Sequence, residues 1–114
     1  MLIGELSRHT GVSTRLLRYY EAQGVLRARR GTNGYRFYDD DAVVTVRQVR
    51  ALLEAGLSTE VIRVVLPCVR GERPDFEWCA ELWDILNGEL EAMNEHIGDL
   101  QRRRDVLAGF VRDL

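Results

Sequence analysis

The chain has 114 residues, of which 46% are hydrophobic and 30% are charged, and its formal net charge is −2. This length and composition are typical of one small globular domain, or of one domain with an extension. There is no run of about 18 apolar residues, and the first residues show no basic segment followed by an apolar stretch, so we expect neither a membrane span nor a secretory signal.

The charge is divided unevenly along the chain. Residues 1–50 hold nine arginines and five acidic residues, net +4, whereas residues 51–114 hold seven arginines and thirteen acidic residues, net −6. A basic first half suits contact with an anionic polymer through one end of the molecule, although an uneven split by chance is the alternative. Two cysteines, Cys68 and Cys79, are too few for a disulfide framework, which favours a reducing cytoplasm.

Two short helices are predicted in the stretch "IGELSRHTGVSTRLLRYYEAQGVL". Gly11 ends the first helix, Ser13 is a suitable N-cap for the second, and Gly24 follows the end of the second. The second helix is expected to bury Leu16, Leu17 and Tyr20. Its other face carries Thr14, Arg15, Arg18 and Tyr19. Two short helices joined by a glycine-containing turn are a helix-turn-helix candidate.

The next stretch, "RRGTNGYRFYDDD", combines three arginines and two tyrosines with an Asn-Gly pair and an acidic run. Asn33-Gly34 predicts a β-hairpin with a type I′ turn, in which both central residues have positive φ. Such a hairpin, tipped by residues 32–34, holds its arginines out in solvent. The three aspartates at 39–41 are interpreted as the N-cap and first-turn acids of the following helix.

Two further helices follow the acidic run. The first has an apolar face with a 3.6-residue period, and Gly56 ends it. Ser58 caps the second, "TEVIRVVL", which Pro67 terminates. The segment "PCVRGERPD", residues 67–75, is interpreted as a linker because it holds two prolines and a glycine.

Residues 76–114 are predicted to form one long helix with Asp75 as its N-cap. A heptad frame places these residues at its a and d positions: Leu86, Leu90, Met93, Ile97, Leu100, Arg104, Leu107, Val111 and Leu114. Eight of the nine are apolar, where composition alone predicts about four. The helix is too long to bury this stripe against its own small domain, so a coiled coil with a second copy is predicted.

The motifs "LRYYE" and "NGYRFY" at this spacing, followed by a lone long helix, resemble the MerR family of bacterial transcriptional regulators nearly from end to end. The resemblance implies a mainly α fold: a winged helix-turn-helix domain at 1–66 with its wing at about 27–38, a linker at 67–75, and a dimerisation helix at 76–114. An antiparallel coiled coil would join two protomers into a homodimer. The seven apolar dimerisation residues are Leu86, Leu90, Met93, Ile97, Leu100, Leu107 and Val111.

The resemblance also implies contacts with double-stranded promoter DNA. The second helix would lie in the major groove and the wing along the backbone, with these residues in contact: Ser13, Thr14, Arg15, Arg18, Tyr19, Arg30, Tyr35, Arg36 and Tyr38. Arginine and tyrosine suit phosphate oxygens and base edges on chemical grounds alone. Core packing is preferred for Tyr20 and Phe37, and a structural role for Glu21.

In this family a dimer binds a near-palindrome in a promoter, and an effector makes it bend and untwist the spacer for RNA polymerase. The sequence departs from the metal-sensing members, because no cysteine follows the long helix. Metal binding by Cys68, Cys79 and His96 is also disfavoured, because Cys79 and His96 lie seventeen residues apart on one predicted helix, about 25 Å along its axis. No metal or cofactor is expected. Thiol sensing by the two cysteines, or an effector pocket at Trp78 and Trp83, are alternatives to plain structural roles.

Other classes of function fit the sequence less well. An enzyme is disfavoured, because the two histidines have no evident partner and no phosphate loop or nucleophile–base spacing is present. An architectural, excisionase-like DNA binder is the main alternative, and the long helix argues against it. A third possibility is a protein-interaction module whose coiled coil binds a different chain.

Overall fold

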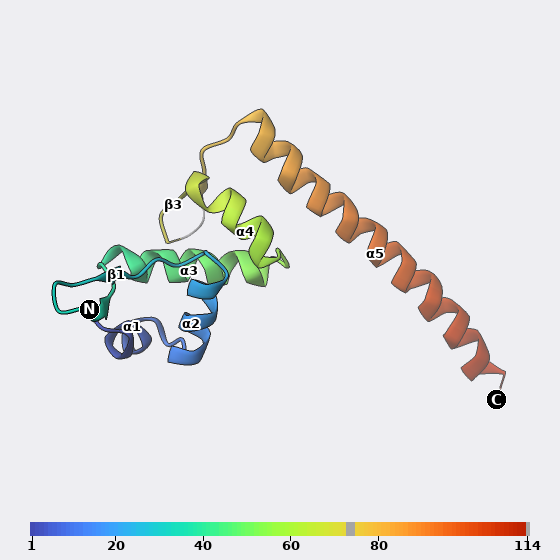
Figure 1. Cartoon of the computed structure of the whole chain (residues 1–114). Coiled ribbons are helices and arrows are strands. Elements are labelled where there is room, and N and C mark those ends of the chain that lie inside the picture. Colours follow the sequence, from blue (N-terminus) through green and yellow to red (C-terminus); the bar gives the residue numbers. More distant parts are fainter. Residues whose placement is uncertain (73–74, 114) are drawn as a thin grey trace. The chain divides into compact units, whose positions relative to one another are not determined.

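The computed structural model describes residues 1–72 and 75–113. The chain divides into two compact units, residues 1–77 and 78–114. The first unit contains α1 (Ile3–Thr10), α2 (Thr14–Ala22), β1 (Arg29–Arg30), β2 (Arg36–Phe37), α3 (Asp41–Glu54), α4 (Thr59–Val65), the 3-10 helix η1 (Leu66–Cys68), β3 (Val69–Arg70) and β4 (Asp75–Phe76). The second unit is built on α5 (Ala80–Arg112), and Figure 1 shows all the helices. The expected mainly helical fold, a helix-turn-helix with a wing and one long helix, is confirmed.

The α1–α2 pair forms the predicted helix-turn-helix. Gly11 ends α1 with φ 72°, a left-handed conformation that glycine adopts without a Cβ clash. The Ser13 hydroxyl oxygen accepts a hydrogen bond from the Leu16 amide at 3.1 Å, as expected of an N-cap. Leu17 and Tyr20 are buried as predicted, but Leu16 is 39% exposed. The prediction that Leu16 is buried was wrong, because the core covers Leu17 and Tyr20 but leaves the neighbouring Leu16 partly uncovered.

The β1–β2 hairpin has a different turn from the predicted one. Its strands are antiparallel, with Arg29 opposite Phe37 and Arg30 opposite Arg36. The Gly31 amide donates to the Tyr35 carbonyl at 2.9 Å, which leaves a three-residue loop. Gly34 has φ 81°, and every described residue with positive φ is a glycine. The loop is therefore a type I turn followed by a left-handed glycine rather than a type I′ turn.

The Asn33 side chain accounts for this choice of turn. Its Oδ1 accepts a hydrogen bond from the Tyr35 amide at 3.3 Å, a local bond that asparagine commonly makes two residues ahead. Asn33 thereby stays at negative φ, and Gly34 alone takes the left-handed conformation.

Helices α3 and α4 supply the rest of the first unit's core. Five of their residues are almost fully buried: Val46, Val49, Leu52, Ile62 and Val65. Ser58 caps α4 as predicted, accepting a bond from the Val61 amide at 3.2 Å. The three aspartates before α3 have separate roles. Asp39 forms an ion pair with Arg29 at 2.9 Å, Asp40 occupies the N-cap without a side-chain hydrogen bond, and Asp41 lies in the first turn.

The long helix begins later than the sequence predicts. Asp75 belongs to β4, which pairs with β3 through Arg70 opposite Asp75 and Val69 opposite Phe76. The N-cap of α5 is Cys79, whose Sγ accepts a hydrogen bond from the Leu82 amide at 3.4 Å. The strand pairing withdraws residues 75–76 from the helix, so the prediction of Asp75 as N-cap was wrong. Positions 73–74 of the predicted linker and Leu114 lie outside the described residues.

Candidate nucleic-acid interface

Helix α2 presents the polar face that the sequence predicts. Arg15, Arg18 and Tyr19 are exposed, while Leu17 and Tyr20 on the opposite side are buried. Thr14 begins the helix and is half-buried, and Ser13 is exposed although its hydroxyl oxygen is engaged by the cap. The N-terminus of α2 therefore offers two hydroxyl groups and an arginine at one end of an exposed cationic face.

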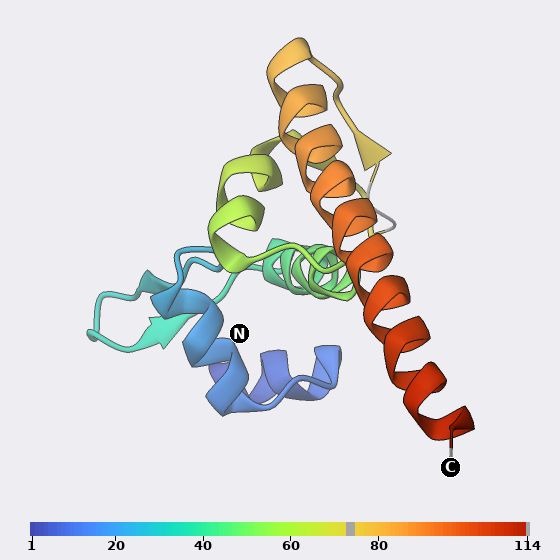
Figure 2. The ribbon, with the colours of Figure 1, turned by 90° about the vertical axis from the view of Figure 1, so that its right-hand side faces the viewer.

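The β1–β2 hairpin adds a second group of exposed side chains. Arg30, Tyr35 and Arg36 are exposed, and Tyr35 at the tip is among the most exposed large side chains of the chain. Figure 2 shows the hairpin beside α2 at the left of the view. Arg29, which the sequence also places in solvent, is engaged by Asp39. The hairpin thus presents arginine and tyrosine side chains near the exposed face of α2.

One hydrogen-bonded group, Glu21, Arg36 and Tyr38, joins the hairpin to α2; we call it the Glu21 network. Arg36 Nη1 donates to Glu21 Oε2 at 2.7 Å, and the Tyr38 hydroxyl donates to Glu21 Oε1 at 3.3 Å. Burial raises the pKa of the Tyr38 phenol, the Glu21 carboxylate raises that pKa further, and the positive charges of Arg36 and Arg18 lower it. Arg18 of α2 and Arg36 of the hairpin therefore lie within electrostatic reach of the same hydroxyl.

The position of Tyr38 corrects one predicted contact. Its side chain is only 1% exposed, and its hydroxyl is bound to Glu21. A ring buried in the domain cannot reach a DNA backbone, so Tyr38 is a core residue whose polar end is satisfied internally. Tyr20 is likewise buried and Phe37 is half-buried, in line with the core packing expected for them.

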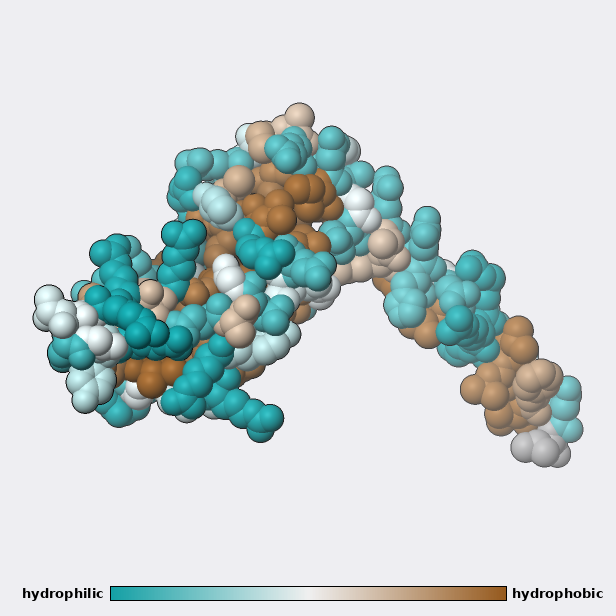
Figure 3. Space-filling view, viewed as in Figure 1, coloured by the Kyte–Doolittle hydropathy of each residue, from teal (hydrophilic) through white to brown (hydrophobic). Residues whose placement is uncertain are grey.

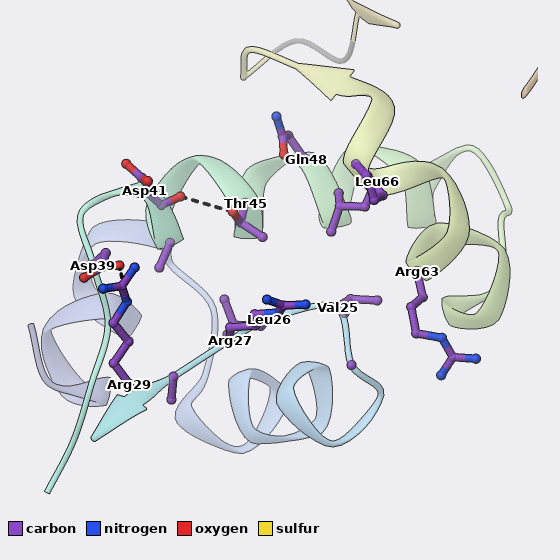
Figure 4. Close-up of a pocket in the computed structure, with 14 residues that line it drawn as sticks. Val25, Leu26, Arg27, Arg29, Asp39, Asp41, Thr45, Gln48, Arg63 and Leu66 are labelled. Atoms are coloured by element: carbon purple, nitrogen blue, oxygen red, sulfur yellow. Dashed lines mark hydrogen bonds and ion pairs between the residues drawn. The ribbon is translucent and has the colours of Figure 1, made fainter. Parts of the chain in front are cut away.

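A groove lies elsewhere in the first unit and is shown in Figure 4. It has a volume of about 710 Å³ and is lined by the segment from Gly24 to Arg29, by residues near the start of α3, and by Arg63, Leu66 and Pro67. None of the predicted DNA contacts and none of the predicted sensor residues lines it. The groove borders the hairpin at Arg29 of β1 but shares no residue with the exposed face of α2.

The predicted sensor residues have unremarkable surroundings. Cys68 is half-buried and Cys79 is exposed, and both thiols are free. Cys79 has a structural role as the cap of α5. Trp78 and Trp83 are exposed. Within residues 1–72 and 75–113, no group of three or more histidine, cysteine or acidic side chains is arranged to hold a metal ion.

Helix α5 carries the apolar stripe that the heptad pattern predicts. Five of its residues on this stripe are exposed: Leu90, Ile97, Leu100, Leu107 and Val111. Leu86 and Met93 are half-buried. Val106 and Phe110, which the heptad frame does not include, are also exposed, and Figure 3 shows hydrophobic atoms gathered toward the C-terminal end of α5. In the part of the chain that is described, no helix is long and apolar enough to cross a membrane.

Comparison with known proteins identifies the first unit. Residues 1–67 match the family model described as MerR HTH family regulatory protein. The chain is 33% identical over 116 residues to the Heavy metal-dependent transcription regulator 2 of Rhizobium meliloti (strain 1021), a match that covers 100% of this chain and 71% of that protein. It is 37% identical over 106 residues to the Nodulation protein NolA of Bradyrhizobium elkanii, covering 92% of this chain and 44% of NolA. The chain therefore spans less than half the length of the NolA relatives that it matches.

Solved structures show the same fold. The transcription regulator PbrR691 from Ralstonia metallidurans, in complex with lead(II), has a TM-score of 0.80 at 24% identity over 98% of this chain and 86% of that chain. HiNmlR, a MerR family regulator lacking the sensor domain and bound to promoter DNA, has a TM-score of 0.58 at 21% identity over 93% and 82% of the two chains. With its helix-turn-helix, its wing and its match over residues 1–67, this chain belongs to the MerR family of DNA-binding transcription regulators.

Proposed function

We propose that the protein binds a near-palindromic promoter site as a homodimer in the cytoplasm and regulates transcription by distorting the DNA between the half-sites. The observation that carries the proposal is the pairing of two cationic surfaces in one compact unit. Arg36 of the β1–β2 hairpin donates a hydrogen bond to Glu21 of α2 at 2.7 Å, which brings the hairpin against the helix that carries the exposed Arg15 and Arg18, so a helix and a wing face one ligand together. Double-stranded DNA offers a groove for the helix and a phosphate backbone for the wing.

Each element has a separate task at this interface. Arg15, Arg18 and Tyr19 of α2 contact base edges and phosphates in the major groove, and Ser13 and Thr14 lie where the helix N-terminus meets a phosphate. The wing places Arg30, Tyr35 and Arg36 on the adjacent backbone. Arginine suits both tasks, because its planar guanidinium offers five donors to phosphate oxygens or to a guanine edge.

The homodimer is supported by the surface of α5. A helix of 33 residues is about 50 Å long, and its stripe of leucine, isoleucine and valine side chains is exposed in the single chain. Burying each such side chain against a partner contributes about 1.5–3 kcal/mol. A second copy supplies the same stripe, and an antiparallel pairing gives a two-fold axis that matches a near-palindrome.

Distortion of the promoter supplies the regulatory step. Bending a site of 20–30 base pairs by tens of degrees costs about 1–6 kcal/mol. A small change in dimer geometry, triggered by a signal, therefore shifts the population of the bent promoter and its use by RNA polymerase. An architectural DNA binder without a response to any signal is the alternative.

DNA affinity of the purified chain is expected to depend steeply on salt. The four proposed arginine contacts, Arg15, Arg18, Arg30 and Arg36, make eight in a dimer. Eight phosphate contacts predict a loss of affinity of about 10⁴-fold between 50 and 200 mM salt, because binding releases condensed counterions. Fluorescence anisotropy measures this loss of affinity with a duplex that the chain has selected from a randomised pool. An unrelated duplex of equal length is the control. A chain that selects no sequence, or binds both duplexes equally, contradicts the proposed regulator.

Chemical footprinting on the selected duplex tests the distortion. We expect hypersensitive bases at the centre of the site, between two protected half-sites, because the dimer axis lies there and the DNA is bent or untwisted at that point. A duplex from which one half-site has been deleted serves as the control, and its central bases are expected to lose the hypersensitivity. Two protected half-sites around an undistorted centre, with transcription still regulated, would rule out the distortion mechanism.

A further inference from the structure

Glu21 is an acidic residue in the middle of the proposed cationic interface. It is the acid of α2, whose other charged residues are Arg15 and Arg18. A carboxylate facing DNA is repelled by phosphates, so its presence among the arginines calls for a compensating role. The proposed DNA interface is the basis of the inference that follows.

Both oxygens of the Glu21 carboxylate are engaged by the segment that leaves the wing. Oε2 accepts from Arg36 Nη1 at 2.7 Å and Oε1 accepts from the Tyr38 hydroxyl at 3.3 Å. Arg36 and Tyr38 are two residues apart, and in an extended chain such residues point to the same side. One carboxylate therefore bonds two successive side chains on the face of the wing that is turned toward α2.

The two partners differ in burial, and this difference sets the geometry. The Tyr38 ring is fixed in the core at 1% exposure, and its hydroxyl needs an internal partner. The Glu21 side chain is 17% exposed, whereas that of Arg36 is 56% exposed. Glu21 is thus held by the core through Tyr38 and holds, in turn, an arginine that reaches into solvent.

We propose that Glu21 is a positioning residue of the DNA interface, which aims the Arg36 guanidinium of the wing at a fixed distance from α2. Only Nη1 of Arg36 is engaged by Glu21, so its Nη2 and Nε donors stay available for a phosphate. The carboxylate, the guanidinium and the phosphate then form a chain of charge-assisted hydrogen bonds. Because the position of Arg36 is fixed relative to α2, the wing binds DNA tightly only where the wing and α2 fit the same site together.

The test compares affinity for the selected duplex with affinity for an unrelated duplex of equal length, measured for the full chain. Glu21→Gln removes the charge, and Glu21→Asp keeps the charge but is one methylene shorter, so it does not reach both partners. We expect both variants to lower the ratio of specific to unspecific affinity by about 10-fold, because each loses a charge-assisted hydrogen bond that positions Arg36. Unspecific affinity is expected to rise for Glu21→Gln, because one negative charge is lost.

Glu54→Gln is the matched control, because Glu54 is exposed at the end of α3 and makes no ion pair within the described residues. It removes the same charge and is expected to leave the ratio unchanged.

In an Arg36→Gln background, Glu21→Gln should have no further effect on the ratio. If the role of Glu21 were purely structural, Glu21→Gln would still lower the ratio in that background. Circular dichroism confirms that each variant is folded.

Two outcomes overturn the inference. The first is that both Glu21 variants keep a ratio of specific to unspecific affinity within twofold of the parent. The second is that Glu21→Gln lowers this ratio while Glu21→Asp does not, because the charge of Glu21 alone would then be the cause. Failure of the parent chain to select any duplex is a different result, because it contradicts the proposed function itself.

Discussion

Replacing Ile97 with glutamate is expected to convert the protein from a dimer to a monomer. Ile97 lies in the middle of the stripe on α5 and is 52% exposed in the single chain. Each dimer would carry the substitution twice, and each buried, unpaired carboxylate costs at least about 2 kcal/mol. The dimer dissociation constant should therefore rise by about three orders of magnitude. Sedimentation velocity over a range of protein concentrations measures the change.

Ala92→Glu provides the control for this experiment. Ala92 is exposed on α5 outside the heptad stripe, so the variant adds the same charge to the same helix without placing it at the predicted interface. It is expected to remain a dimer. We also expect Ile97→Glu to lose affinity for a duplex with two half-sites far more than for a single half-site. A dimer that survives Ile97→Glu would show that α5 does not pair through this stripe.

Replacing Arg18 with alanine is expected to abolish most sequence-specific DNA binding while the fold stays intact. Arg18 is exposed on α2 and makes no ion pair within the part of the chain that is described. A base-edge or phosphate contact by arginine contributes about 1–3 kcal/mol, and a dimer has two such contacts. Affinity for the selected duplex should fall by about 100-fold or more. Anisotropy titrations at several salt concentrations also measure how steeply the logarithm of the affinity falls with the logarithm of the salt concentration. This slope should become shallower by the equivalent of about two phosphate contacts per dimer.

Arg102→Ala is the control for Arg18→Ala. Arg102 lies on α5, where it is within 3.7 Å of Asp99, and its removal changes the net charge by the same amount. We expect its DNA affinity to stay close to that of the parent. An equal loss for both variants would mean that overall charge, rather than a contact by α2, governs binding.

Much of the first unit could be predicted from local signals in the sequence. The helix caps at Ser13 and Ser58 depend on hydrogen bonds from their own side chains. The helices end at Gly11 and Gly56, because glycine adopts the left-handed backbone conformation readily. Both effects act over only a few residues. The hairpin also follows from local chemistry. Its turn type was predicted wrongly, because the Asn33 side chain bonds the Tyr35 amide and leaves the left-handed conformation to Gly34, a local effect that the Asn-Gly pair alone does not indicate.

The errors of the prediction arose where contacts between separate elements decide the structure. Tyr38 follows the wing arginines in the sequence, but its backbone is hydrogen-bonded to Met1 and its ring is buried in the core, which the sequence around the wing does not indicate. Leu16 lies next to a buried leucine, yet nothing packs over it in the described fold to cover it fully. The predicted start of α5 was wrong because residues 75–76 pair with residues 69–70 as a strand. The preference of aspartate for helix N-caps gives no information about such a pairing.

The sequence by itself determined the elements of this protein: the helix-turn-helix, the hairpin, the long helix with its apolar stripe, and the basic character of the first half. These follow from spacing, capping and composition, which act over a few residues. Only the tertiary structure decided how Glu21 serves the wing, because its two partners lie 15 and 17 residues away. Burial of the Tyr38 ring fixes one of those partners, and that burial is a property of the assembled core rather than of any short segment.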